Sequence, residues 1–152
     1  MKIMDTNPGE KEGGLGYLLT QVSFLKQRIT NAALKKWDIT YIQFVILAGV
    51  MELEEAGKPV TQQTVSDERR LDKAMVSIVV KALIARGYLL REAYPTDKRA
   101  FRLILTDAGR EKAMCGKKIA RRVDDVFFKG IDEARFYDSL IQLLENNNVK
   151  NE

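Results

Sequence analysis

Residues 72–110 constrain the fold of this chain more than any other stretch. The run DKAMVSIVVKALIARG has apolar side chains at i, i+3, i+4 and i+7, which indicates a helix with one buried face. Asp72 is placed to cap the start of this helix, and Gly87 follows its last periodic residue, where a left-handed stop is needed. The positions expected to be buried are Val76, Val79, Val80 and Leu83.

The opposite side of the predicted helix is small, polar and basic. Lys73, Ser77 and Lys81 follow one another at intervals of four residues, so they share one face. A solvated helix face would explain these residues, because surface charge needs no further reason. The alternative is a face that meets a ligand.

Two β-prone runs follow Gly87. YLLRE and FRLIL are separated by AYPTDKRA, in which Pro95 and Asp97 are typical turn residues, and Thr106 then caps a new helix that begins DAGREKAM. A helix with a small, polar and basic face followed by a basic hairpin is the arrangement of a winged helix-turn-helix. Its helix fits the major groove of DNA and its hairpin, the wing, fits a minor groove. We therefore predict a mainly α fold with a small β-hairpin wing.

The flanking segments read as helices. Residues 15–36 carry an apolar stripe with alternating steps of three and four, typical of a helix that packs along a long partner. Either a core helix or a dimerisation helix would explain this pattern. Further helices are predicted from Thr40, which forms a capping-box pattern with Gln43, and over residues 61–70, 107–128 and 132–145. The stripe consists of Leu15, Leu18, Val22, Leu25, Ile29 and Ala32.

Composition excludes most enzyme classes. The chain has no histidine and a single cysteine, Cys115, so neither the usual zinc sites nor a histidine-activated nucleophile can be built, and we expect no metal, no cofactor and no catalysis. Its 152 residues suit one domain, without a signal peptide or a membrane span, which favours a cytoplasmic location. Residues 58–112 hold twelve Lys and Arg against seven Asp and Glu, a balance of +5, whereas the flanks are −1 and neutral. A basic centre between neutral flanks favours nucleic acid as the partner.

The most specific motif lies in YPTDKRAFRLILTDAGR. Asp97 and Arg99 form a D-x-R pattern, and Leu105, Thr106 and Gly109 form L-T-x-x-G. On these motifs, and on the preceding run DKAMVSIVVKALIARGYLLRE, the chain resembles the MarR family of bacterial transcriptional regulators over nearly its full length.

The resemblance implies one domain over residues 1–152. It comprises a winged-helix DNA-binding layer at about 38–106 and dimerisation helices at 15–36 and 107–146. It also implies a homodimer that regulates transcription, usually as a repressor, whose DNA binding is lowered by a small ligand or by oxidation. We expect double-stranded DNA with a pseudo-palindromic operator as the partner. The alternative is a winged-helix module that binds proteins and no specific DNA sequence.

Several side chains are candidates for DNA contact. Arg99 would enter a minor groove with Asp97 fixing its geometry, although the same pair would also serve as a local salt bridge of the turn. Ser77 would meet a base edge, and Ile78 would either touch a thymine methyl group or pack inside the fold. The other candidates, on phosphates or on the wing, are Lys73, Lys81, Lys98, Arg102, Thr61 and Thr64.

The effector site has no assigned residues. Trp37, Tyr41 and Tyr17 would line a cleft between the two layers or belong to the core. Cys115 is either a reactive thiol among lysines or, as we favour, an inert one.

Overall fold

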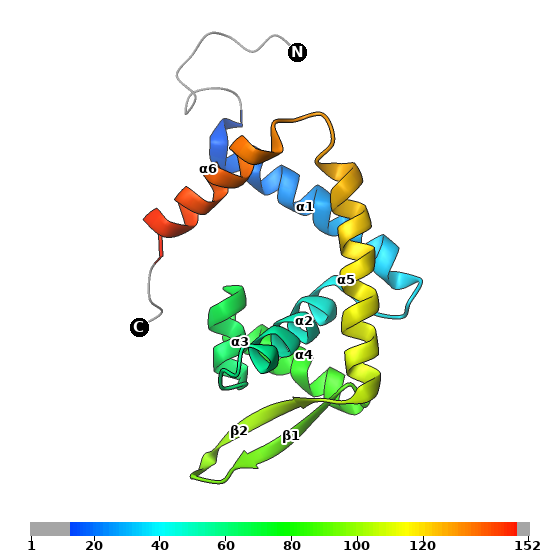
Figure 1. Cartoon of the computed structure of the whole chain (residues 1–152), viewed down its shortest axis with the longest axis vertical. Coiled ribbons are helices and arrows are strands. Elements are labelled where there is room, and N and C mark those ends of the chain that lie inside the picture. The colour runs from blue at the N-terminus through cyan, green and yellow to red at the C-terminus, as the bar shows by residue number, and fades with distance from the viewer. Residues whose placement is uncertain (1–12, 149–152) are drawn as a thin grey trace.

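The computed structural model describes residues 13–148. Within this range, residues 97–100 are described by their backbone alone. Within this range six helices and one antiparallel hairpin follow one another along the chain (Figure 1). The elements are α1 (Gly14–Lys35), α2 (Tyr41–Glu55), α3 (Gln62–Arg69), α4 (Lys73–Ala85), β1 (Leu89–Tyr94), β2 (Asp97–Leu105), α5 (Asp107–Phe127) and α6 (Glu133–Asn146).

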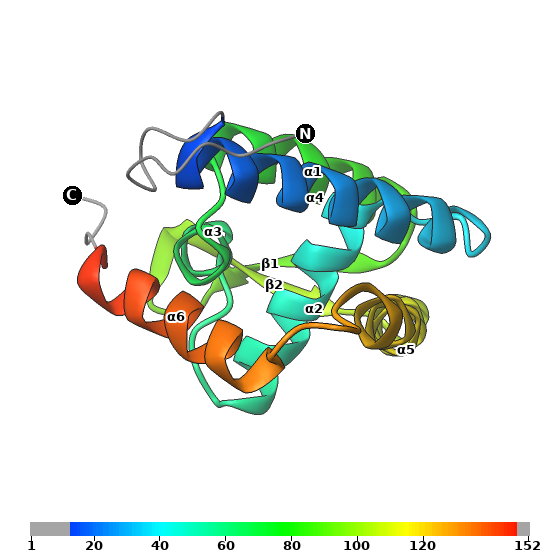
Figure 2. The same ribbon diagram turned by 90° about the horizontal axis from the view of Figure 1, so that it is seen from above.

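The elements lie at two levels, which α5 joins. In Figure 1, α1 and α6 are at the top, whereas α2, α3, α4 and the hairpin are below. The long helix α5 runs down one side from the upper level to the base of the hairpin, and it is seen nearly end-on from above in Figure 2. The segment of residues 72–110 thus forms the lower edge of the molecule.

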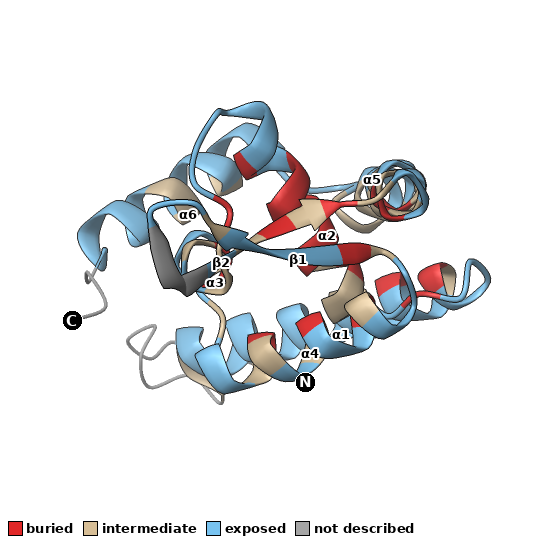
Figure 3. Cartoon of the chain, turned by 90° about the horizontal axis from the view of Figure 1, so that it is seen from below, coloured by how far each residue is buried: buried red, intermediate tan, exposed pale blue. Residues whose placement is uncertain are grey.

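The core centres on α2. This helix buries apolar side chains on most of its circumference, as expected for an element in the middle of a fold. Figure 3 shows its buried segments together with those of α4 and of the β-strands where they meet α5. Val76, Val80 and Leu83 of α4 are fully buried and Val79 is half-buried, which confirms the predicted inner face of that helix.

The helix starts predicted from capping residues are confirmed. The Thr40 hydroxyl accepts a hydrogen bond from the backbone N–H of Gln43 (3.1 Å), and the Gln43 side chain accepts one from the N–H of Thr40 (3.1 Å). Asp72 caps α4 through the N–H of Met75, and Thr106 caps α5 through the N–H of Gly109. Each cap satisfies backbone donors that the first turn of a helix leaves without a partner.

Close packing of α5 on α2 depends on a glycine. A Cβ atom at Gly116 would lie 2.4 Å from Cδ2 of Phe44, a contact that folded proteins do not make. The absence of a side chain therefore lets the Phe44 ring pack directly against the α5 backbone. Gly116 is therefore the point at which α2 and α5 approach each other closely.

The stripe on α1 is exposed within one chain. Leu15 is 72% exposed and Leu25 is 48% exposed, and only Thr30 and Leu34 of this helix are buried. None of the residues of α6 is buried. The interpretation of the stripe as part of the chain's own core is therefore wrong.

The hairpin is longer than predicted. Only Pro95 and Thr96 separate the strands, because the run DKRA, which we assigned to the connecting turn, continues β2. Leu89 pairs with Leu105 and Ala93 with Phe101, and an irregularity follows at Tyr94. No helix in residues 13–148 is long and apolar enough to cross a membrane.

Candidate nucleic-acid interface

The polar face of α4 is open to solvent. Lys73 and Lys81 are exposed and Ser77 is half-buried, on a face that borders the buried valines and is not opposite them as predicted. Ile78 is 70% exposed, so the alternative that it packs inside the fold is wrong. We call Lys73, Ser77, Ile78 and Lys81 the reading face.

A hollow of about 570 Å³ adjoins the reading face. Ser77 and Lys81 form its α4 side, the start of α3 forms a second side, and the hairpin forms the third. The residues that α3 and the hairpin contribute are Thr61, Gln62, Gln63, Arg91, Phe101 and Leu103. Helix, helix start and hairpin therefore surround one concave surface rich in hydrogen-bond donors.

Arg91 and Phe101 were not among the residues predicted from the sequence. The Arg91 guanidinium lies 5.3 Å from the centroid of the exposed Phe101 ring, within the range of a cation–π contact. Alternation along a strand places Arg91 on the same side as buried Leu89, and therefore toward α4. The alternation of side chains along this strand was visible in the sequence. Placing Arg91 beside Phe101, however, required the register of the two strands.

Arg102 lies on the other face of the hairpin. It is directly opposite Glu92 in the register, and the two side chains form an ion pair with an Nη2–Oε1 distance of 3.0 Å. Because neighbouring residues on a strand alternate, Arg102 points away from the hollow that contains Phe101 and Leu103. The structure therefore does not bring Arg102 to the reading face.

The three remaining wing candidates fall on residues whose side chains are not described. The backbone of Asp97, Lys98 and Arg99 belongs to β2, beside the turn of the hairpin, and their side chains lie outside the described part of the structure. Their roles therefore stay predictions.

The two threonines at the start of α3 cap each other. The Thr61 hydroxyl accepts from the N–H of Thr64 (3.0 Å), and the Thr64 hydroxyl accepts from the N–H of Thr61 (2.8 Å). Thr64 also donates to the carbonyl of Pro59 and lines a different hollow, beside Asp67 and Glu68. Of the pair, only Thr61 borders the hollow at the reading face.

The aromatic residues considered for an effector cleft do not form one group. Trp37 and Tyr17 are 51% and 59% exposed, so neither is a core residue, whereas Tyr41 is half-buried against the core. Cys115 is a half-buried free thiol on α5. Across residues 13–148, no group of three or more His, Cys, Asp or Glu side chains is arranged to hold a metal ion.

Comparison with known proteins identifies the family. Residues 37–100 match the model of the MarR family. An uncharacterized HTH-type transcriptional regulator of Bacillus subtilis (strain 168), YdcH, is 33% identical over 132 residues, which are 86% of this chain and 90% of that protein.

Solved structures share the fold at lower identity. BpsR of Bordetella bronchiseptica, whose DNA binding is regulated by 6-hydroxynicotinic acid, superposes with a TM-score of 0.79 at 21% identity, covering 95% of this chain and 99% of BpsR. A mutant of MarR from E. coli complexed with operator DNA superposes with a TM-score of 0.73 at 22% identity, covering 86% and 92%. The full-length relative, the matched family model and the winged fold agree, and the chain belongs to the MarR family of winged helix-turn-helix transcriptional regulators.

Proposed function

We propose that this regulator binds a pseudo-palindromic operator in double-stranded DNA and acts as a repressor in the cytoplasm, without catalytic activity of its own. The observation that carries the proposal is the reading face, which opens into a hollow shared by the start of α3 and the hairpin. A helix with two exposed Lys side chains and a half-buried Ser, flanked by a concave basic surface, suits the major groove and its phosphates.

Each side chain of the reading face has a distinct role in this proposal. Ser77 contacts a base edge, Ile78 contacts a thymine methyl group, and the two lysines neutralise phosphates. Thr61 contributes a hydroxyl at the rim of the hollow, and the wing contributes Arg99, with Asp97 and Lys98 beside it. We leave Arg102 and Thr64 out of the DNA contacts, because both face away from the hollow.

A second copy of the chain would cover the exposed apolar surface of the upper level. The five Leu, Val and Ile side chains of the α1 stripe and the α6 side chains Tyr137, Leu143 and Leu144 are between 40% and 72% exposed, far more apolar surface than isolated exposed residues would present. A symmetric dimer brings the same surface of both chains together. It also supplies two reading faces, which would occupy major grooves about one DNA turn apart on a site of roughly 16–20 base pairs.

We further propose that a small molecule lowers operator affinity. The DNA binding of BpsR, which has the same fold, is regulated by 6-hydroxynicotinic acid. An effector that favours a different spacing of the two reading faces would change DNA affinity by a coupling free energy of about 1–3 kcal/mol.

The test is a fluorescence anisotropy titration with labelled DNA from upstream of the protein's own coding region, across a salt series. If about six phosphates are contacted, the log–log slope of affinity against salt should be near −5. Lys81→Gln should make this slope shallower by about one unit, because it removes one phosphate contact. The control is Lys129→Gln, which removes an exposed lysine from the connection between α5 and α6, and it should leave the slope unchanged.

The outcomes separate the proposal from its rival. Binding that survives excess random competitor DNA supports a sequence-specific regulator. Binding that the competitor abolishes supports a DNA-binding protein whose operator lies elsewhere. No binding at low salt would favour the alternative, a winged-helix module that binds proteins.

A further inference from the structure

The α1–α2 corner, residues 36–40, is where the upper level meets the DNA-binding level. Thr30 and Leu34 in the last turns of α1 are the buried residues of that helix, which also packs along α5, where Lys26 pairs with Asp124 at 2.9 Å. At Asp38 the backbone adopts a left-handed conformation (φ 56°), which turns the chain sharply before Thr40 caps α2. The covalent connection between α1 and α2 runs through this corner.

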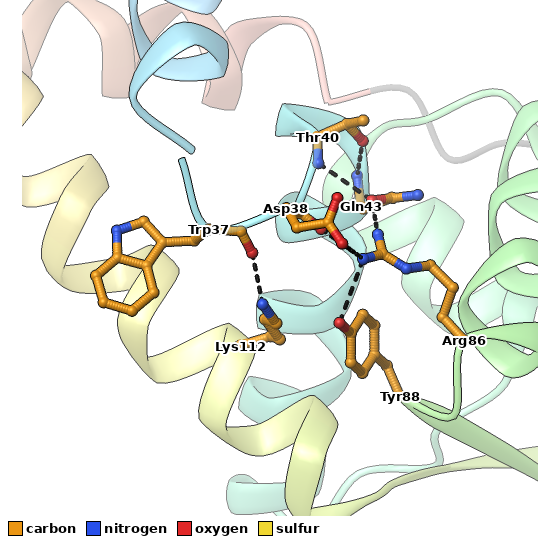
Figure 4. Close-up of polar contacts among 7 residues, drawn as sticks. All are labelled: Trp37, Asp38, Thr40, Gln43, Arg86, Tyr88 and Lys112. Carbon is orange, nitrogen blue, oxygen red and sulfur yellow. Dashed lines mark hydrogen bonds and ion pairs between the residues drawn. The ribbon is translucent and has the colours of Figure 1, made fainter. Parts of the chain in front are cut away.

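Arg86, the residue that caps the C-terminus of α4, holds the corner (Figure 4). Its Nη2 donates to the backbone carbonyl of Asp38 and to the Asp38 carboxylate, both at 2.6 Å. Its Nη1 donates to Oε1 of Gln43 at 3.3 Å, the same oxygen that accepts from Thr40 in the cap of α2. One guanidinium thus joins the end of α4 to the corner and to the first turn of α2.

A second cation secures the same corner from α5. Lys112 donates to the backbone carbonyl of Trp37. The ring of Tyr88, at the start of the hairpin, lies 4.9 Å from the Arg86 guanidinium and 5.8 Å from the Lys112 ammonium. Figure 4 shows Tyr88 between these two side chains and the Trp37 indole pointing away from them. The corner is therefore bound by side chains of α5 and of the end of α4, and both of these side chains lie against Tyr88.

The ion pair by itself does not explain this arrangement. The Asp38 side chain is 91% exposed, and a pair with so much solvent access contributes little stability. The carbonyl of Asp38, the amide oxygen of Gln43 and the Tyr88 ring are the partners that orient Arg86. These partners belong to the backbone or to side chains that are themselves held in place. The guanidinium therefore fixes the angle between α4 and the corner, in addition to neutralising a charge.

We propose that Arg86 is a positioning residue for DNA recognition. It fixes the orientation of α4 relative to α1, and thereby the spacing of the two reading faces in the dimer. This inference rests on the proposed function, because spacing matters only for a dimer that binds two half-sites. Arg86 itself contacts no DNA in this proposal, since it lies at the opposite end of α4 from Lys73 and beside the corner.

The experiment compares four variants of the full-length protein. Arg86→Met removes every side-chain donor, and Arg86→Lys keeps one charged donor. Asp38→Asn removes the carboxylate charge but keeps the backbone carbonyl, and asparagine tolerates a left-handed backbone. The control is Arg69→Met, which removes another short guanidinium–carboxylate pair, to Glu52 at 2.5 Å, from a side chain of similar exposure (26% against 29%). That pair joins α2 to α3 within the lower level and does not reach the corner.

Two readouts distinguish positioning from stability. The first is the affinity for the DNA upstream of the coding region, divided by the affinity for random duplex. It is measured on the upstream DNA as it stands and with one or two base pairs inserted between its half-sites. The second is acrylamide quenching of Trp37, the single tryptophan of the chain, which sits in the corner and reports its order without DNA. A thermal melt of each variant shows whether Arg86→Met and its control Arg69→Met lose comparable stability.

We expect Arg86→Met to lower specific affinity by at least about fivefold, to leave binding to random duplex within about twofold of wild type, and to flatten the dependence on half-site spacing. Trp37 should become easier to quench, and Arg86→Lys should recover part of both effects. Asp38→Asn and Arg69→Met should resemble wild type in spacing preference and in quenching.

Two results would overturn the inference. If Asp38→Asn matches Arg86→Met, the contact is an ordinary ion pair and the carbonyl has no special part. If wild type binds its operator and Arg86→Met shows unchanged spacing preference and quenching, Arg86 has no positioning role. A wild-type protein that binds no DNA refutes the proposed function, and the role of Arg86 in recognition with it, so the two failures are distinguishable.

Discussion

Gly109→Ala tests how closely α5 packs on the base of the wing. A Cβ atom at this position would lie 2.0 Å from the backbone carbonyl oxygen of Tyr88 and 3.1 Å from Cδ1 of Leu105. Neither neighbour yields easily, since one is backbone and the other is a buried side chain. The methyl group therefore has to displace the start of the hairpin from the first turn of α5.

The cost follows from the contacts that this displacement breaks. The N–H of Thr106 donates to the carbonyl of Tyr88 (3.2 Å), and the Thr106 hydroxyl donates to the carbonyl of Gly87 (2.6 Å). Each hydrogen bond contributes about 0.5–1.5 kcal/mol, and overpacking adds about 1–3 kcal/mol. Alanine returns at most about 1 kcal/mol through its higher helix propensity. We expect a loss of about 3 kcal/mol in the free energy of unfolding.

The assay is urea unfolding followed by circular dichroism, at one fixed protein concentration because the stability of the proposed dimer would depend on it. The matched control is Gly49→Ala in α2, where the added methyl would meet only the flexible side chain of Arg69, with its Nε at 3.0 Å. That variant should stay within about 0.5 kcal/mol of wild type, as the propensity gain offsets a small shift of Arg69. If Gly109→Ala proves as stable as the control, the close approach to Tyr88 is not a constraint and the reasoning fails.

Three further substitutions test other parts of the molecule. Leu25→Glu on the exposed α1 stripe should convert a dimer to a folded monomer in sedimentation equilibrium, and an unchanged mass would place the interface elsewhere. Ser77→Ala should lower operator affinity about tenfold while random-duplex affinity changes little, and equal loss on both DNAs would argue against a base contact. Gly116→Ala should cost about 1–2 kcal/mol in urea unfolding, because the Phe44 ring can move further than a backbone carbonyl, and a gain in stability would contradict that packing.

The capped starts of the helices and the inner face of α4 were predictable from the sequence. Thr40 with Gln43, Asp72 and Thr106 form the predicted caps, and Val76, Val80 and Leu83 form the predicted buried face. These features depend on residues three to seven positions apart, which the helix itself brings together. Local spacing therefore carries enough information to place them.

The candidate site was only partly predictable. Lys73, Ser77 and Lys81 lie on one exposed face as expected, because they share a single helix. Arg91 joins them and Arg102 does not, since that choice depends on which face of the hairpin turns toward α4. The predicted turn was too long for the same reason, because cross-strand pairing decides where β2 begins.

Tertiary structure alone decided whether α1 is a core helix and how its corner is held. The steps of three and four along α1 fit a seam with any partner, and only the placement of α2 and α5 shows that the stripe is not covered by its own chain. Asp38 and Arg86 meet across 48 positions of sequence, and nothing in the local pattern of either residue predicts that contact. Periodicity and capping are properties of a single segment, so the sequence determines them directly. Contacts between segments depend on how all of them pack together, and only the folded chain determines those.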